Sequence, residues 1–417
     1  MRYIADLHIH SKYSRACSKD LEIPKINEWA KVKGIDIIGT GDFTHPLWLK
    51  HLKENLFESK QGLFKSKDDK NSLYFMLTSE VSCIYKQEDK VRRLHICIFS
   101  PSFKSVEKII QVLEKRGVNL KSDGRPIMGI HADELVKIIL DVNEKNLIIP
   151  AHAWTPWFSV FGSYSGFNSL EECFGSQSKY IYSIETGLSS DPPMNWRVSA
   201  LDKITMISNS DAHSPANLGR EANVFEIPEN KLSYDEIYRI IKEKDKKRFL
   251  YTIEFFPEEG KYHFDGHRDC KIQLKPEQSE KSKGLCPVCK KPLTIGVLNR
   301  VYQLADRKEG FKPDTIGYKS LVPLAEIIAD VLGQGKLTKK VDVLYRDLIS
   351  KGGSEFKILL DIPVEELKKI VLPEIALAIK NVREGKLEIF PGYDGVYGVV
   401  KVFKEGQLKK PMQKSML

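Results

Sequence analysis

Short apolar runs rich in β-branched residues alternate with amphipathic stretches over about the first 250 residues. The runs lie at residues 3–7, 36–39, 74–78, 94–99, 147–150, 180–184 and 204–208. Between most of them, apolar residues recur at every third and fourth position, the period of a helix with one buried face. The clearest helical patterns lie at residues 106–116, 132–144 and 233–246. This alternation predicts an α/β fold with a mainly parallel sheet, and about seven units without a break favour a barrel over an open sheet.

The pattern changes near residue 257. Over residues 257–292, Pro, Gly, Lys and His become more frequent and the apolar period disappears, which is typical of a small module not held by a hydrophobic core. Helical patterns return at residues 321–332, 340–350 and 364–371, and residues 388–398 have the composition of a short hairpin. We therefore predict three domains: a barrel over 1–255, a small module over 256–300, and a mainly helical domain with a terminal β-hairpin over 301–417.

Composition fits a folded protein with more than one core. The chain has 417 residues, of which 41% are hydrophobic and 29% charged. No apolar run approaches the roughly 20 residues that span a bilayer, and the N-terminus lacks the basic start and apolar stretch of a signal peptide. We therefore expect a cytoplasmic protein with no membrane partner. The net charge of +9 is compatible with a polyanionic partner, but Lys- and Glu-rich composition is equally typical of proteins from hot environments.

Metal-ligating residue types follow nearly every predicted strand. The first strand ends in His8-Ile9-His10, and alternate residues of a strand point the same way, so the two histidines share a face. Later strands supply Asp42, Glu80, His95, His152, Asp211 and His213. A single buried histidine is more often a core residue whose ring nitrogens are hydrogen-bonded. When His and carboxylate residues recur at the C-terminal ends of successive strands, they indicate the catalytic face of a (β/α) barrel.

Imidazole and carboxylate at this density suit zinc, manganese or iron. Glu80 has two carboxylate oxygens and can therefore bridge two ions. Two ions about 3.5–4 Å apart activate a water and hold both oxygens of an in-line displacement at phosphorus. The residues therefore predict a metal-dependent phosphoesterase.

The ordered set of these motifs resembles the polymerase and histidinol phosphatase (PHP) family over about residues 1–250. The resemblance implies a distorted (β/α)7 barrel that hydrolyses phosphoesters with two or three divalent ions (Zn, Mn or Mg). Two positions depart from the family pattern: Phe43 stands where many members have a His, and residues 15–17 stand where many have a further ligand. His45 is a candidate substitute, and Asp42 is either a metal ligand or a residue that orients one.

Three further residues near the predicted strand ends are candidates for the site. We assign Asp191 to catalysis together with Glu80 and Asp211; the alternative is a turn residue before a Pro pair. Glu185 and His131 are weaker candidates, and His131 is better placed to begin a helix.

A second metal site is predicted in the small module. His267-x-x-Cys270 and Cys286-x-x-Cys289 are separated by fifteen residues, the spacing of a structural zinc site. Four ligands leave no open position, so we expect one zinc ion with a role in folding. The alternatives are a Cys286–Cys289 disulfide, which a reducing compartment disfavours, and His263 as the fourth ligand.

Barrel, zinc-binding module and helical segment together resemble the endonuclease Q family over essentially the whole chain, including residues 40–46 with Phe43 and residues 391–395. The resemblance implies a metal-dependent DNA repair enzyme. It would cut double- or single-stranded DNA on the 5′ side of deaminated bases (uracil, hypoxanthine, xanthine) and abasic sites. The rival functions are a phosphatase for a small phosphate monoester and a catalytically inactive DNA-binding scaffold.

A lesion-specific nuclease takes its target base out of the stack, and aromatic side chains can hold that base. Trp154, Trp157 and Phe158 follow His152 and are our candidates for this contact; the alternative is a hydrophobic cover on the barrel. Loop 62–72 is either a phosphate contact or a solvated insertion. Residues 413–417 resemble the opening of a sliding-clamp-binding peptide, or match it by chance. Further candidate phosphate contacts are Lys121, Arg125, Arg300 and Arg307.

Overall fold

The computed structural model describes residues 1–68 and 73–404. Its main sheet is mixed. β1 (Arg2–Asp6) pairs in parallel with β2 (Ile37–Gly39), which pairs in parallel with β5 (Tyr74–Gln87). β6 (Lys90–Ser100) pairs antiparallel with β5, and β8 (Leu147–Pro150) pairs antiparallel with β6.

On its other side, β1 pairs antiparallel with β11 (Ala222–Glu226), which pairs antiparallel with β12 (Phe249–Glu254). β15 (Gly317–Ser320) then pairs in parallel with β12. The remaining strands of this sheet are β3 (Leu56–Lys60), β4 (Leu63–Ser66) and β7 (Ile127–Met128). Because β15 belongs to the predicted third domain, the main sheet extends past residue 300, and the division into three domains stays a prediction.

β9 (Ser183–Glu185) and β10 (Thr205–Ile207) form a separate parallel pair. Single backbone hydrogen bonds join this pair to the main sheet: Ala153 N donates to Glu185 O (2.9 Å), and His10 N donates to Ala212 O (3.1 Å). The seven predicted strand regions overlap β1, β2, β5, β6, β8, β9 and β10. The mixed α/β class is therefore confirmed, and the closed, distorted (β/α)7 barrel stays a prediction.

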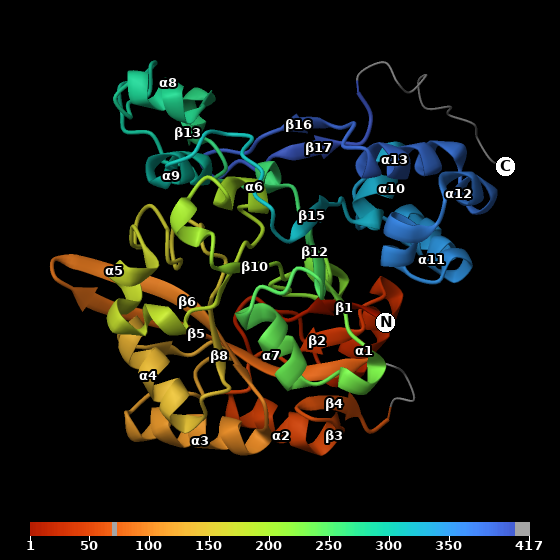
Figure 1. Cartoon of the computed structure of the whole chain (residues 1–417). Helices are drawn as coiled ribbons and strands as arrows, with labels where there is room; N and C mark the ends of the chain where they lie inside the picture. Colours follow the sequence, from red (N-terminus) through yellow and green to blue (C-terminus); the bar gives the residue numbers. More distant parts are fainter. Residues whose placement is uncertain (69–72, 405–417) are drawn as a thin grey trace.

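The β5–β6 hairpin corrects the expectation of a mainly parallel sheet. Only Glu88 and Asp89 join the two strands, and so short a link permits antiparallel pairing alone. Glu88 adopts φ 54°, the left-handed backbone that two-residue hairpin turns require. The link contains no Gly or Asn, so the sequence carries no turn signal. The hairpin extends past α5 (Figure 1).

Amphipathic helices cover the sheet where the sequence predicts them. α3 (Phe103–Lys115), α4 (Ala132–Val142) and α7 (Tyr234–Lys242) match the three predicted helices to within about a turn. α3 buries Val106, Ile109 and Leu113 on one face. The other helices of this part are α1 (Ile23–Lys33), α2 (Pro46–Asn55), α5 (Leu170–Phe174) and α6 (Pro192–Asn195).

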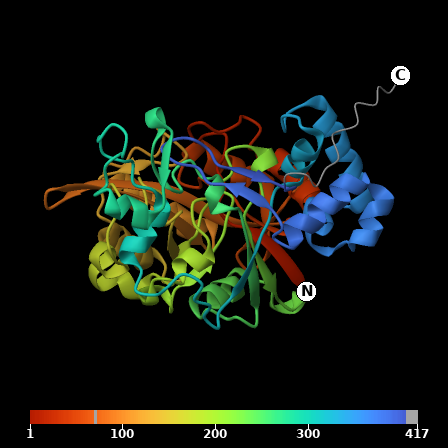
Figure 2. The ribbon, with the colours of Figure 1, turned by 90° about the horizontal axis from the view of Figure 1, so that it is seen from above.

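The C-terminal part contains the predicted helices and hairpin. The small module has β13 (Asp265–His267), β14 (Ile272–Leu274), α8 (Pro276–Lys281) and α9 (Val297–Leu304). The helical domain has α10 (Leu324–Leu332), α11 (Lys339–Gly352), α12 (Val364–Ile370) and the unpredicted α13 (Pro373–Arg383). β16 (Glu388–Phe390) and β17 (Val399–Lys401) form the antiparallel hairpin, which lies between the module and the helical domain (Figures 1 and 2).

Among the helices of the described ranges, none is long and apolar enough to cross a membrane. Residues 413–417, the candidate clamp-binding peptide, lie outside the described residues, as does part of loop 62–72.

Candidate active site

Glu80 on β5 lies between two groups of histidines. Its Oε2 is 3.3 Å from Nε2 of His10 and 3.7 Å from Nε2 of His8. Its Oε1 is 2.9 Å from Nδ1 of His95 and 3.2 Å from Nε2 of His152. The four histidines come from the ends of β1 and β8 and from β6, and all are buried with Glu80. Each oxygen of this one carboxylate therefore faces a different group of nitrogen ligands.

Asp211 completes the first group. Its Oδ1 is 3.0 Å from Nε2 of His10 and 3.8 Å from Nε2 of His8. One potential ligand atom from each of His8, His10, Glu80 and Asp211 lies within 4.8 Å of the others, and the same holds for Glu80, His95 and His152. The structure therefore brings together six of the eight predicted active-site ligands.

Three atoms in this cluster lack the partners that buried polar atoms require. His8 Nε2, His10 Nε2 and Asp211 Oδ1 are buried and make no well-aligned hydrogen bond among the described residues, although Asp211 Oδ1 lies 3.0 Å from His10 Nε2 and 3.8 Å from His8 Nε2. Such atoms are costly unless something else satisfies them, and a cation among imidazole nitrogens and carboxylate oxygens would do so. The donor set thus fits divalent ions that accept nitrogen and oxygen ligands.

A second layer of carboxylates fixes the orientation of the histidines. Asp42 Oδ1 is 3.0 Å from Nδ1 of His10, and its Oδ2 accepts from Ser11 N at 2.7 Å. Glu185 lies 3.0 Å from Nδ1 of His8 and accepts from His152 N at 2.9 Å. Both carboxylates bind the far ring nitrogen and so turn Nε2 toward the cluster. Of the two alternatives for Asp42, the structure favours the orienting role.

Electrostatics keep the ligand carboxylates charged. Burial alone raises the pKa of Glu80, but His95, Arg125 and His8 outweigh burial and hold this pKa well below its usual range. Burial lowers the pKa of His10, but Asp42, Asp211 and Glu80 outweigh burial and raise it. The cluster therefore presents negative carboxylates to any ion that binds there.

The remaining histidine candidates lie at the rim or outside the cluster. His213 is partly exposed, with Nδ1 2.8 Å from Asp211 O and its ring 4.7 Å from that of His10. His45 precedes α2 and stacks on Tyr13 at 4.4 Å. His131 precedes α4, as expected of a residue that begins a helix.

Asp191 has a structural contact outside the two ligand groups. Its Oδ1 accepts from Met194 N at 2.9 Å and caps the short helix α6. Burial raises the pKa of this carboxyl to about 7. The structure thus places Asp191 as the alternative predicts, at a turn before the Pro pair.

The aromatic loop after His152 divides into a buried part and an exposed part. Trp154 is 1% exposed and its Nε1 donates to Asn195 Oδ1 at 2.7 Å, so its ring packs in the core. This corrects its assignment to substrate binding, because a ring enclosed on both faces has no room for a base. Trp157 is 36% exposed and stacks on Tyr164 at 4.7 Å. Phe158 is half-buried, with its ring 4.7 Å from that of His95.

A cavity of about 1250 Å³ opens beside the cluster. Two of its lining residues contact the site directly: Thr155 Oγ1 is 3.2 Å from Nδ1 of His152, and Arg220 Nε donates to Ser210 O at 2.9 Å. Further lining side chains come from the small module, the hairpin and the helical domain: Lys261, Tyr262, Lys336, Lys339 and Tyr397. The lining also includes the acidic residues Glu259, Glu326 and Asp342, and Lys336 pairs with Glu326, so the cavity carries a modest excess of basic groups.

The candidate phosphate contacts differ in position. Arg300 donates to the carbonyls of Phe161 and Phe167, and Arg307 pairs with Asp202. These two arginines therefore already have structural partners. Lys121 is exposed. Arg125 Nη1 is 3.0 Å from Glu80 Oε2, a contact that no sequence signal indicated.

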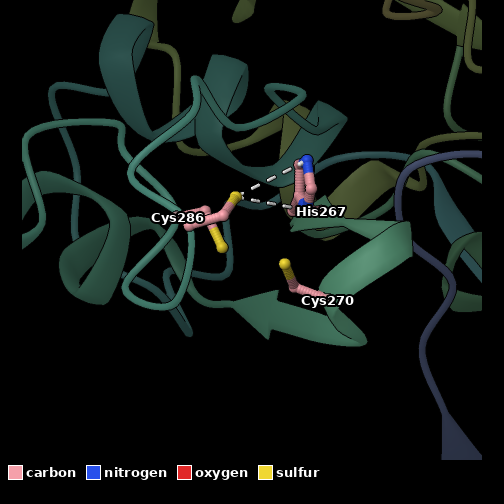
Figure 3. A group of neighbouring side chains, drawn as sticks. His267, Cys270 and Cys286 are labelled. Atoms are coloured by element: carbon pink, nitrogen blue, oxygen red, sulfur yellow. Dashed lines mark hydrogen bonds between the residues drawn. The ribbon is translucent and has the colours of Figure 1, made fainter.

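The predicted zinc ligands lie together in the small module. His267, Cys270, Cys286 and Cys289 each offer an atom within 4.8 Å of the others. Figure 3 shows the side chains of His267, Cys270 and Cys286 pointing toward one another. Cys289 Sγ is 3.9 Å from the ring nitrogens of His267. Cys286 and Cys289 are free thiols, which excludes the disulfide alternative in this structure. His263 lies outside this group and packs against Phe264.

Comparisons with known proteins give matches to parts of the chain and to nearly all of it. Residues 323–386 match the family described as the MJ0043 C-terminal domain. The protein MJ0043 of Methanocaldococcus jannaschii is 35% identical over 254 residues, which cover 60% of this chain but only 31% of that relative.

Two solved structures are similar over nearly the whole chain. One is the crystal structure of the lesion-specific endonuclease PfuEndoQ from Pyrococcus furiosus, with 35% identity, coverage of 96% of this chain and 95% of that chain, and a TM-score of 0.85. The other is Endonuclease Q in complex with a 27-mer duplex that carries an abasic lesion at the active site. It has 34% identity, coverage of 97% and 98%, and a TM-score of 0.85.

Proposed function

Because this chain belongs to the endonuclease Q family, we propose that it is a metal-dependent DNA repair endonuclease. It hydrolyses the phosphodiester on the 5′ side of deaminated bases (uracil, hypoxanthine, xanthine) and abasic sites. The observation that carries this proposal is Glu80, whose two oxygens each face a separate group of potential metal ligands. A small-monoester phosphatase would use the same cluster but would leave the whole-chain similarity unexplained. An inactive scaffold would leave the cluster itself unexplained.

The ligand groups are suited to in-line hydrolysis. His8, His10, Glu80 and Asp211 would hold one divalent ion, and Glu80, His95 and His152 a second. Bound divalent ions lower the pKa of water and neutralise charge on phosphoryl oxygens. Water attacks phosphorus, and the bond to the leaving 3′ oxygen breaks. Asp211, whose side chain is 24% exposed, is the ligand carboxylate placed to contact the attacking water.

Residues around the cluster supply binding and orientation. Asp42 and Glu185 hold His10 and His8 in the orientation described above. Trp157 lines the cavity and Phe158 contacts the ring of His95, and these two are the remaining candidates to stack on an extruded base. One structural zinc in the small module would hold the loops that line the cavity from that side.

The direct test is cleavage of end-labelled DNA that carries a single uracil, hypoxanthine or abasic site. We expect a nick just 5′ of the lesion with Mg²⁺ or Mn²⁺, none with EDTA and none on undamaged DNA. Glu80→Gln keeps the shape but loses the shared charge, so the rate should fall about a thousandfold or more. Release of phosphate from small esters without a nick, or full activity in Glu80→Gln, would contradict the proposal.

A further inference from the structure

We propose that Arg125 is a catalytic residue that binds the scissile phosphate directly, a role that rests on the proposed function. Arg125 Nη1 is 3.0 Å from Glu80 Oε2, the oxygen that also faces His8 and His10. The Arg125 side chain is 21% exposed, whereas that of Glu80 is fully enclosed. The guanidinium therefore contacts the shared metal ligand while part of the same side chain reaches solvent.

The backbone of Arg125 is fixed on both sides. Arg125 N donates to Asp123 Oδ1 at 3.0 Å, Gly124 N donates to Tyr13 O at 3.0 Å, and Ser82 N donates to Pro126 O at 3.0 Å. A Cβ at Gly124 would lie 2.3 Å from Asp42 Oδ2, so this segment approaches the site closely enough to exclude a side chain there. The segment thus holds the guanidinium at the cluster, as a preorganised catalytic group requires.

The guanidinium retains capacity for an oxyanion. It has five N–H donors in a planar fork, and its contact with Glu80 uses Nη1. Within the described residues, Nη1 is the guanidinium nitrogen with a hydrogen-bond partner, and neither Nε nor Nη2 is a fully enclosed atom without one. A planar fork of this kind matches two oxygens of a phosphate.

Charge balance gives the guanidinium a role distinct from that of the ions. Arg125 is the permanently charged group among the residues that contact Glu80, since the others are histidines. When cations share Glu80, the arginine charge is no longer offset by that carboxylate and can act on the phosphate oxygens. Because arginine stays protonated at any working pH, this positive charge does not depend on which ion is bound.

The test is a double-mutant cycle in which one change replaces Arg125 and the other removes the negative charge of the scissile linkage. Full-length wild type and Arg125→Gln are compared on abasic-site duplexes whose scissile linkage is an ordinary phosphate or an uncharged methylphosphonate. Affinity is measured by fluorescence anisotropy with Ca²⁺ in place of Mg²⁺ or Mn²⁺. Arg116→Gln is the matched control, because Arg116 is an exposed arginine that pairs with Glu134 on helix α4.

For wild type and Arg116→Gln, we expect the uncharged linkage to weaken DNA affinity strongly. For Arg125→Gln, the loss of affinity on the same change of linkage should be smaller by about tenfold or more. Arg125→Gln should also lower kcat by about 100- to 1000-fold, and Arg125→Lys should recover part of this, because lysine keeps the charge but not the fork. Mn²⁺ affinity of Arg125→Gln and Arg125→Lys should be preserved, and unchanged melting curves show that the variants fold.

An equal response of wild type and Arg125→Gln to the neutral linkage would overturn the proposal. Combined with weaker Mn²⁺ binding, this result would make Arg125 a positioning residue for Glu80. Failure of the proposed function would look different, because wild type itself would then leave lesion-containing DNA uncut.

Discussion

Single side chains in the cluster differ in role according to which atom they present. Glu80 presents one oxygen to each ligand group, so removing its charge affects both. Asp42 and Glu185 instead contact the Nδ1 atoms of His10 and His8, so they act on the metals only through the rings. The first role is shared coordination, and the second is orientation.

Asp42→Asn should therefore weaken the site without destroying it. An amide keeps the shape but loses the charge that fixes the ring of His10, and changes of this kind typically cost about 10- to 100-fold in metal affinity or activity. Titration of cleavage with Mn²⁺ should show a higher half-saturating concentration and partial recovery at high Mn²⁺. A loss as complete as that of Glu80→Gln at every Mn²⁺ concentration would show that Asp42 is itself a ligand.

Buried carboxyls away from the cluster affect stability rather than chemistry. Glu254 is enclosed at the end of β12 and accepts from Thr186 Oγ1 and Ser208 Oγ. Burial, with the nearby charge of Asp191, raises the pKa of Glu254 to about 8. Burial and Glu254 also raise the pKa of Glu221. These acids retain protons in the folded protein that the unfolded chain releases.

The stability of the protein should consequently fall as pH rises from about 5 to about 8. In that window the unfolded state has lost the Glu254 proton and the folded state still binds it, so the free energy of unfolding decreases with pH. Glu254→Gln has no proton to release and should lose less stability over the same window. Urea unfolding at both pH values tests this, with exposed Glu309→Gln as the control. An identical pH response in wild type and Glu254→Gln would contradict it.

The small module has short elements and little apolar burial of its own. β13 and β14 have three residues each and α8 has six, while Cys286, Leu293 and Val297 are among its few buried hydrophobic residues. Elements this short need another source of stability, and an ion bound by the Cys₃His group at their junction would provide it.

Cys286→Ser should remove the bound zinc and lower the melting temperature by several degrees, because the module loses the ion that holds it together. Cleavage per folded molecule should change by less than about tenfold, since the catalytic ligands lie in the barrel. Zinc content, measured by a chelation assay, should fall by about one ion per chain. Cys173→Ser, another buried thiol, should leave zinc content unchanged. An unaltered melting curve in Cys286→Ser would count against the module's dependence on metal.

At the scale of the whole molecule, a buried polar contact joins α1 to the C-terminal helices, which lie close to α1 in Figure 1. Lys33 Nζ, at the end of α1, is 2.8 Å from Glu355 Oε2. Tyr345 Oη donates to the same oxygen at 2.6 Å, and Leu324 N donates to Glu355 Oε1 at 3.0 Å. All four groups are buried, so the domains are attached in one defined position.

Glu355→Gln should destabilise the protein by about 3–5 kcal/mol, because it leaves the Lys33 charge buried without its carboxylate. The double variant Lys33→Met/Glu355→Gln should recover part of this loss, which thermal or urea unfolding can measure. The exposed pair Lys351–Asp347 is the control, and Asp347→Asn should cost less than about 1 kcal/mol. A similarly small cost for Glu355→Gln would show that the contact does not hold the domains.

The amino-acid sequence by itself determined the local features of this protein. Apolar periodicity located seven strands of the first 250 residues and six helices, α3, α4, α7, α10, α11 and α12, because side-chain period follows directly from backbone geometry. Ligand residue types in or just after the predicted strands identified Glu80, Asp211 and the four clustered histidines, although Glu80 and His95 lie within β5 and β6 and not at their ends. Cys/His spacing identified the four residues that lie together in the small module. The apolar pattern did not predict helix α13, because its buried face depends partly on the small residues Ala376 and Ala378.

Only the tertiary structure decided which distant residues meet. Glu185 contacts His8 across 177 positions and Arg125 contacts Glu80 across 45, and no local pattern records either contact. The burial of Trp154 and the orienting role of Asp42 likewise depend on neighbours supplied by other elements. The sequence therefore specified the kinds of ligand at the strand ends, whereas long-range packing set the distances, orientations and solvent access on which the chemistry depends.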